Sequence, residues 1–259
     1  MNFNLGDFVT RKSYQNDLVF KIIKIDNDMV YLKGVDVRLL ADAPINDLVI
    51  YKDDVKEDFD IEIKNIKNER NEFFYLPGKV LHLDADGEYL DRCLKFYKKN
   101  NVYAIGKKVK EENIPKQISF LLKEYKPDIV VITGHDAFNK KSKDVHDIKN
   151  YKNSQYFVNS IKEARKYEKS HDKLVIISGA CQSNYEELIK AGANFASSPK
   201  RINIHALDPA IIATCVAITE RNKEIDLINL LNKTKYGPDG IGGIICNGLM
   251  YVGFPRWWI

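Results

Sequence analysis

From about residue 76 onward, the sequence alternates short apolar runs with stretches of helical spacing. The apolar runs are too short for helices and are bounded by turn residues, which is typical of buried strands. Buried strands that alternate with helices predict an α/β fold, a mostly parallel sheet flanked by helices. The expected strands are 79–84, 102–105, 128–133, 174–178 and 202–205, and the expected helices are 89–99, 115–125, 156–169, 184–191 and 209–218.

Residues 1–50 follow a different pattern, with short β-rich segments separated by Asn, Asp and Gly. Closely spaced strands of this kind predict a small SH3-like β-barrel. Residues 51–75 are dense in charged side chains and are interpreted as a linker, so that the α/β domain spans 76–259. The strands expected in the barrel are 8–9, 19–25, 30–32 and 37–40.

The composition limits which binding partners and which cellular compartment can be expected for the protein. The chain has 259 residues, and its 40 basic side chains are interspersed with 36 acidic ones, so a nucleic-acid partner is not indicated. Neither a signal peptide nor an apolar run long enough to span a membrane is visible, which favours a cytoplasmic protein without a membrane partner. The widely spaced cysteines form no CxxC pair, so reduced thiols are expected and no metal or cofactor is indicated; they are Cys93, Cys181, Cys215 and Cys246.

Polar side chains follow three of the predicted strands at the point where each strand ends. They are Asp84 and Asp86 after the first strand, His135 and Asp136 after the third, and Cys181 after the fourth. Ligands of open α/β sheets bind at the carboxyl ends of the strands. We therefore expect these side chains to lie close together at the functional edge of the sheet.

Cys181 and His135 have the chemistry of a nucleophile and its base, because a neighbouring imidazole activates a thiol. Ser183 or Asn184 is expected to cap the helix after Cys181, whose amide dipoles would favour a thiolate. Backbone amides of Cys181 and Asp136 could form an oxyanion hole. The alternatives are a cysteine that only packs at a strand end, a surface histidine and ordinary tight turns.

The remaining histidines are weaker candidates for this role. His82 lies inside an apolar strand and is expected in the core, whereas His146 and His171 have polar neighbours and are expected to be exposed. His205 ends a predicted strand and is kept as a reserve candidate.

A strand ending in His, followed by a strand ending in Ala-Cys, resembles the caspase-like cysteine peptidases. Over nearly its full length the sequence also resembles the YabG family of sporulation-specific proteases of spore-forming Firmicutes. The segments that carry this second resemblance are 6–14, 37–42, 83–87, 131–137, 177–184 and 199–209.

The resemblance implies a caspase-like sheet and a cysteine endopeptidase with a catalytic Cys181/His135 dyad. It also implies protein substrates, namely spore-coat and germination precursors that are cleaved after basic residues in the mother cell. Association of the enzyme with the forming spore coat is a further expectation. Many caspase-like enzymes have Gly directly after the catalytic His, whereas this chain has Asp136.

Cleavage after Arg requires an acidic side chain in the specificity pocket, because a carboxylate binds a guanidinium bidentately. The candidates are Asp84, Asp86 and Asp208, and the alternative is that these acids cap helices or line turns. The basic pair Lys200-Arg201 lies shortly after Cys181 and is a candidate for self-processing, or else a basic surface loop.

Two other functions fit parts of the sequence. The segment from Asp84 to Gly87 also resembles the phosphatase motif of haloacid-dehalogenase enzymes, which would make Asp84 a nucleophile and both acids Mg²⁺ ligands. The chain could instead be a non-catalytic coat-assembly module in which the N-terminal barrel is the active part.

Overall fold

The computed structural model describes residues 3–53, 55, 63, 72–142 and 144–256. The chain divides into two compact units, residues 1–60 and 61–259. Most of the predicted charged linker, namely 54, 56–62 and 64–71, lies outside the described residues. The end of that predicted linker is part of a strand, because β6 (Phe74–Leu76) pairs with β13 (Tyr251–Gly253).

The N-terminal unit is an antiparallel sheet with the strand order β4-β3-β2-β1-β5. Alternate side chains of its strands, such as Val9, Phe20 and Leu32, form a separate small core. The expected strand at 37–40 is wrong in position, since β4 begins where that segment ends. The elements are β1 (Phe8–Arg11), η1 (Lys12–Tyr14), β2 (Phe20–Asp26), β3 (Met29–Gly34), β4 (Leu40–Pro44), η2 (Ile45–Asp47) and β5 (Leu48–Ile50).

The second unit contains a six-stranded sheet with the order β12-β11-β10-β9-β7-β8. Neighbouring strands from β8 to β11 pair in parallel, and β12 alone runs antiparallel to its neighbour. The mainly parallel sheet expected from the alternating pattern is thereby confirmed. The strands are β7 (Val80–Asp84), β8 (Ala104–Lys108), β9 (Ile129–Thr133), β10 (Val175–Ser178), β11 (Phe195–Ser197) and β12 (Ile241–Gly243).

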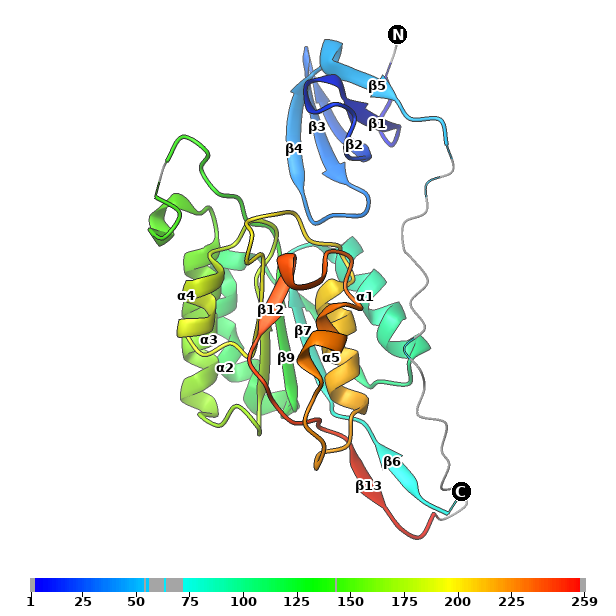
Figure 1. Ribbon diagram of the computed structural model, residues 1–259. Coiled ribbons are helices and arrows are strands. Elements are labelled where there is room, and N and C mark those ends of the chain that lie inside the picture. Colours follow the sequence, from blue (N-terminus) through cyan, green and yellow to red (C-terminus); the bar gives the residue numbers. More distant parts are fainter. Residues whose placement is uncertain (1–2, 54, 56–62, 64–71, 143, 257–259) are drawn as a thin grey trace. The chain divides into compact units, whose positions relative to one another are not determined.

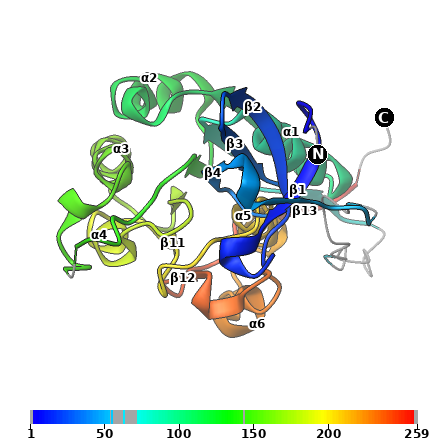
Figure 2. The same cartoon turned by 90° about the horizontal axis from the view of Figure 1, so that it is seen from above.

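Helices cover both faces of this sheet (Figure 1), as the predicted layers require. On one face α3 packs against α2 and α4, and the view in Figure 2 shows α3 beside α4. On the other face α1 and α5 contact each other. The helices are α1 (Gly87–Lys99), η3 (Glu111–Asn113), α2 (Ile114–Tyr125), η4 (Ile148–Asn150), α3 (Ser154–Tyr167), α4 (Tyr185–Lys190), α5 (Asp208–Ile218), α6 (Leu227–Leu231) and η5 (Gly237–Asp239).

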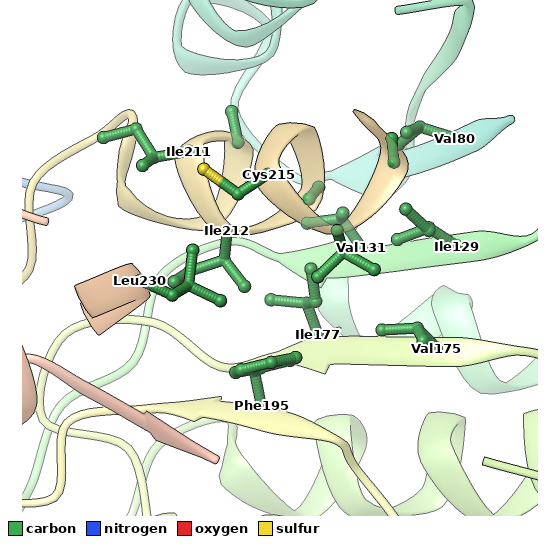
Figure 3. Close-up of a cluster of buried hydrophobic side chains, with 14 of the residues drawn as sticks. Val80, Ile129, Val131, Val175, Ile177, Phe195, Ile211, Ile212, Cys215 and Leu230 are labelled. Atoms are coloured by element: carbon green, nitrogen blue, oxygen red, sulfur yellow. The ribbon is translucent and has the colours of Figure 1, made fainter. Parts of the chain in front are cut away.

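The sheet separates two hydrophobic cores, because successive side chains of a strand point to opposite faces. In β9, Ile129 and Val131 belong to the core beneath α1 and α5, which Figure 3 shows. Val130 and Ile132 belong to the core beneath α2 and α3. Helix α5 is buried over nearly its whole length, which explains why its sequence is apolar on every side.

The strand expected at 202–205 is wrong, because this segment is not a strand of the sheet. The place beside β10 is taken by β11, which comes earlier in the chain. The carbonyl of Ile202 instead accepts a hydrogen bond from the amide of Gln182 (3.0 Å), so the segment is bound to the turn after β10.

Within the described residues, no helix combines the length and the apolar composition needed to cross a bilayer.

Candidate active site

The carboxyl ends of β7, β9 and β10 bring the three polar clusters of the sequence to one edge of the sheet. Strand β9 lies between β7 and β10 and is parallel to both. The amide of Gly179 extends the β9–β10 pairing by donating to the carbonyl of Ile132 (3.1 Å). The turn with His135 therefore lies beside the turn with Cys181.

The imidazole of His135 lies among side chains on the β7 side of β9. Its Nε2 is 3.7 Å from Oδ2 of Asp86, its Nδ1 is 3.6 Å from Oε1 of Glu111, and its ring centroid is 6.0 Å from that of Tyr89. The side chain is 15% exposed. Nε2 is buried and makes no hydrogen bond within the described part of the chain.

Glu111 was not found by sequence reasoning, yet it contacts His135 at both backbone and side chain. Its Oε1 accepts the backbone amide of His135 (2.7 Å). Gly134 makes this approach possible, because a Cβ there would lie 2.5 Å from the same oxygen. Burial alone would raise the pKa of Glu111, but its hydrogen bonds with His135 outweigh burial, so the pKa lies below its ordinary value.

The thiol of Cys181 is completely buried. Its Sγ accepts a hydrogen bond from the amide of Ile204 (3.2 Å) and lies 3.8 Å from the carbonyl oxygen of the same residue. The turn that holds Cys181 has left-handed backbone at Gly179 (φ 111°) and Gln182 (φ 57°). The sulfur is in contact with the backbone of Ile204 on both its donor and its acceptor side.

The helix after Cys181 is capped as expected by one of the two predicted residues. Asn184 is the N-cap of α4, and its side chain accepts from the amide of Glu187 (3.3 Å). The helix has 6 residues and starts at Tyr185. Because a helix dipole acts mainly within its first turn, α4 contributes little to the state of a thiol at residue 181.

The other cysteines lie in the interior of the α/β unit. All four cysteines of the chain are free thiols and all are buried. Burial raises the pKa of Cys215 to about 11 and that of Cys246 to about 12, so neither forms a thiolate at neutral pH.

The three acids expected to bind a basic substrate side chain differ in accessibility. Asp84 is fully buried and accepts hydrogen bonds from Thr133 Oγ1 and from the amide of Asp86, both at 2.9 Å. Asp208 is also fully buried and accepts from the amides of His205 (2.9 Å) and Lys235 (3.0 Å).

Asp86 is the most accessible of these acids, although its side chain is only 12% exposed. One of its oxygens caps α1 by accepting from the amides of Glu88 (2.9 Å) and Tyr89 (3.2 Å). The other oxygen faces His135.

Two of the remaining histidines lie where the sequence indicated, since His82 is fully buried in β7 and His146 is exposed. The exposed position expected for His171 is wrong, because this side chain is partly buried beside Arg165. His205 is buried, and its Nδ1 accepts from the amide of Leu207 (3.1 Å).

The basic pair considered for self-processing lies on the segment that covers Cys181. Arg201 donates from Nε to the hydroxyl of Tyr151 (2.6 Å) and from a terminal nitrogen to the carboxylate of Glu186. Its other terminal nitrogen donates to the carbonyl of Pro199 (3.1 Å). Lys200 is exposed. Residues 198–204, which we call the strap, are thus bound to Tyr151 and to α4 through Arg201, and to the turn after β10 through Ile202 and Ile204.

The chain is similar to a protease over nearly its whole length. The sporulation-specific protease YabG of Bacillus subtilis (strain 168) is 41% identical over 288 residues, which cover 98% of this chain and 99% of that protein. The family model described as YabG peptidase U57 matches residues 4–70 and 54–255. The protein with this α/β unit, and with polar side chains at one edge of its sheet, is therefore a peptidase.

The chain belongs to the YabG peptidase U57 family, which confirms the resemblance carried by the sequence segments above and makes the protein a sporulation protease. This membership sets aside the phosphatase and the non-catalytic coat-assembly alternatives. Within the described residues, no group of three or more His, Cys, Asp or Glu side chains could hold a metal ion.

Solved structures share only a distant likeness with the chain. The receiver domain of Francisella response regulator 1452 has 19% identity and a TM-score of 0.34, covering 54% of this chain and 96% of its own. The Saccharomyces cerevisiae complex of Ypd1 with the receiver domain of Ssk1 gives 12% identity and a TM-score of 0.35, covering 56% of this chain and 94% of the matched chain. Likeness at this level carries no information on activity.

Proposed function

We propose that the protein is a cysteine endopeptidase in which Cys181 is the nucleophile and His135 the general base. The observation that carries the proposal is the adjacency of the two turns after β9 and β10 in a chain of a peptidase family. Parallel neighbouring strands present their terminal side chains at the same edge, where a nucleophile and its base can act together.

The proposed reaction begins when the thiolate of Cys181 attacks the carbonyl carbon of the scissile peptide bond. Backbone amides of Cys181 and Asp136 stabilise the oxyanion of the tetrahedral intermediate. His135 protonates the departing amine, and a water molecule then hydrolyses the thioester with His135 as base.

Glu111 has the geometry to orient the imidazole in this reaction. It fixes the backbone of His135 by a hydrogen bond and lies close to Nδ1. The carboxylates of Glu111 and Asp86 both face the ring, so the positive charge that His135 acquires during proton transfer has two neighbouring partners.

The proposal includes displacement of the strap, residues 198–204, before a substrate reaches Cys181. The contacts of His135 lie on the β7 side of the edge, and those of Cys181 are with the strap. In the proposed active state the strap has moved away and the imidazole faces the thiol. Of the three candidate acids, Asp86 is the one proposed to bind the basic residue before the scissile bond, because the carboxylates of Asp84 and Asp208 are fully buried.

The proposed substrates are spore-coat and germination precursor proteins, cleaved after Arg in the mother cell of a sporulating bacterium. The relationship to a sporulation-specific protease supports this assignment. Self-processing at Lys200-Arg201 is part of the proposal, because cleavage there would divide the strap and free its contacts with Cys181.

The test is a panel of short peptides that differ only in the residue before the scissile bond. Peptides with Arg are expected to be cleaved fastest, and Cys181→Ala and His135→Ala are each expected to lower the rate by about a thousandfold or more. Cys246→Ala is the matched control, since it removes another buried thiol of the same unit. Undiminished cleavage by Cys181→Ala protein would exclude a cysteine mechanism at this residue.

Self-processing is tested by incubating the purified protein and identifying fragments by mass spectrometry. Cleavage after Arg201 in the wild type, but not in Cys181→Ala, is the expected result. If Lys200→Gln/Arg201→Gln protein gives the same fragments as the wild type, the cleavage site lies elsewhere.

A further inference from the structure

The carboxylate of Asp136, the residue directly after His135, is the centre of a buried hydrogen-bond network. The side chain is 3% exposed. Its Oδ1 accepts the backbone amides of Ala137 (2.9 Å) and Asn153 (2.7 Å). Its Oδ2 accepts the hydroxyls of Ser183 (2.9 Å) and Ser154. The network therefore joins the turn after β9, the start of α3 and the turn after β10.

Each serine hydroxyl of this network also accepts a hydrogen bond from the turn that carries Cys181. The hydroxyl of Ser183 accepts the amide of Ala180 (2.9 Å). The hydroxyl of Ser154 accepts the amide of Asn184 (2.8 Å). A serine hydroxyl has one hydrogen to donate, and both serines give it to the carboxylate while their lone pairs bind the turn. The backbone is thus held on either side of Cys181.

The same network also fixes the backbone of His135. The side-chain amide of Asn153 donates to the carbonyl of His135 (2.7 Å), while the backbone amide of Asn153 donates to Asp136. The amide of Phe138 adds a further connection between the turns by donating to Oε1 of Gln182 (3.3 Å).

A buried carboxylate at this place is costly for the fold. Burial raises the pKa of Asp136, against the hydrogen bonds from Ser154, Asn153 and Ser183, which favour the ionised form. Burying a charge disfavours folding unless many donors satisfy it, and a well-packed apolar cluster often stabilises a fold as well or better. The hydrogen bonds of the network have fixed directions, and they link the turn after β9 to the turn after β10.

We propose that Asp136 is a positioning residue of the peptidase site, which sets the separation and orientation of the His135 turn and the Cys181 turn through Ser183 and Ser154. The proposal rests on the proposed Cys181/His135 dyad. It gives the side chain of Asp136 a role in addition to that of its backbone amide, which is proposed to stabilise the oxyanion. Reactivity between two groups depends steeply on their placement, and a displacement of about 1 Å can cost about a hundredfold in rate.

The experiment compares Asp136→Asn, Ser183→Ala and Ser154→Ala in the full-length protein. Asparagine keeps the shape of the side chain but presents a donor where the network requires an acceptor. The matched control is Ser160→Ala, because Ser160 is another buried serine of α3 whose hydroxyl donates to a backbone carbonyl, that of Tyr156 (2.8 Å). Peptide cleavage gives kcat and KM, and thermal unfolding reports stability.

A positioning role predicts that kcat falls by about tenfold to a hundredfold in Asp136→Asn and Ser183→Ala, with KM within about threefold of wild type. The double variant Asp136→Asn/Ser183→Ala should lose little more than Asp136→Asn alone, because both changes break one network. Ser160→Ala should leave kcat unchanged, because the hydroxyl of Ser160 bonds within α3 and alanine is a good helix former.

Two outcomes overturn the proposal. One is an unchanged kcat in Ser183→Ala and Ser154→Ala, the milder variants that remain informative if Asp136→Asn does not fold. The other is a loss of kcat that follows stability equally in all variants, including Ser160→Ala. Cys181→Ala is assayed in parallel to separate the two proposals. If this variant keeps its activity, the dyad itself is contradicted. If it is inactive while the network variants are fully active, only the role of Asp136 is contradicted.

Discussion

The imidazole of His135 lies between two carboxylates, those of Asp86 and Glu111, at 3.7 and 3.6 Å. Of these acids, Asp86 is recognisable in the sequence because it follows an apolar strand directly. Glu111 is not recognisable in this way. It lies in a charged stretch between β8 and α2, and it contacts His135 only because the fold brings that stretch next to the turn after β9. A sequence pattern reports what each segment does locally and carries no signal for such a contact.

Replacing Glu111 tests whether it orients the imidazole. Glu111→Gln keeps an oxygen that can accept the His135 amide but removes the negative charge beside the imidazole, so kcat is expected to fall by about fivefold, which corresponds to about 1 kcal/mol. The neighbouring Glu112, which is exposed, provides the control Glu112→Gln. Steady-state cleavage of an Arg-containing peptide is the measurement, and equal rates in the two variants would contradict an orienting role.

The lowered pKa of Glu111 also predicts how stability depends on pH. A carboxyl whose pKa is lower in the folded state stabilises the fold above its unfolded pKa, and this contribution disappears as the pH falls through the folded pKa. Glu111→Gln should therefore reduce the free energy of unfolding near pH 7 and have a smaller effect below about pH 4. Urea unfolding across this range measures both, and a difference from wild type that is constant with pH would be the contrary result.

At the scale of elements, the strands with a clear apolar sequence were predictable, whereas β11 and β12 were not. β7, β9 and β10 are mostly apolar because each lies between two hydrophobic cores. β11 and β12 are short and contain small residues such as Ala196 and Gly242, which give no clear strand pattern. The segment 202–205 alternates apolar and polar residues as a strand does, but its backbone groups bind the turn around Cys181.

The strap is held by Arg201, and weakening that contact should expose Cys181. Burial would raise the pKa of Glu186, but the hydrogen bond and charge of Arg201 hold it below its ordinary value, in agreement with the pairing. Glu186→Gln is expected to increase alkylation of Cys181 by about fivefold, because a partly exposed ion pair contributes about 1 kcal/mol or less. Glu187→Gln, which removes an exposed pair with Lys190, is the matched control.

Iodoacetamide labelling followed by peptide mass spectrometry measures this exposure. Cys215 and Cys246 should remain unlabelled in every variant because burial raises the pKa of both thiols. Equal labelling of Cys181 in Glu186→Gln and Glu187→Gln would show that Arg201 does not hold the strap closed.

At the scale of the whole molecule, the chain consists of two units with separate hydrophobic cores. The core of the first unit is built from β1–β5 and neighbouring segments, and the two cores of the second surround its parallel sheet. Ile63 is buried in one core of the second unit, so the boundary of an independent α/β unit lies before this residue.

This division predicts that residues 61–259 fold without the N-terminal unit. The shortened chain should cleave a short peptide with a kcat within about threefold of the full-length value, because each domain has its own core. Circular dichroism during heating and the peptide assay test folding and activity. A shortened chain that folds cooperatively but has lost activity towards a short peptide would assign the N-terminal unit a direct part in catalysis.

The complete burial of the Cys181 sulfur also bears on its lifetime in a cell. Oxidation of cysteine to sulfenic and higher acids proceeds through an accessible, ionised sulfur, so burial lowers the reactivity of Cys181 towards peroxide. With Cys181 as the proposed nucleophile, we therefore expect molecules with the strap in this position to keep that sulfur reduced for longer. In this proposal, movement of the strap would start both proteolysis and oxidation of the sulfur.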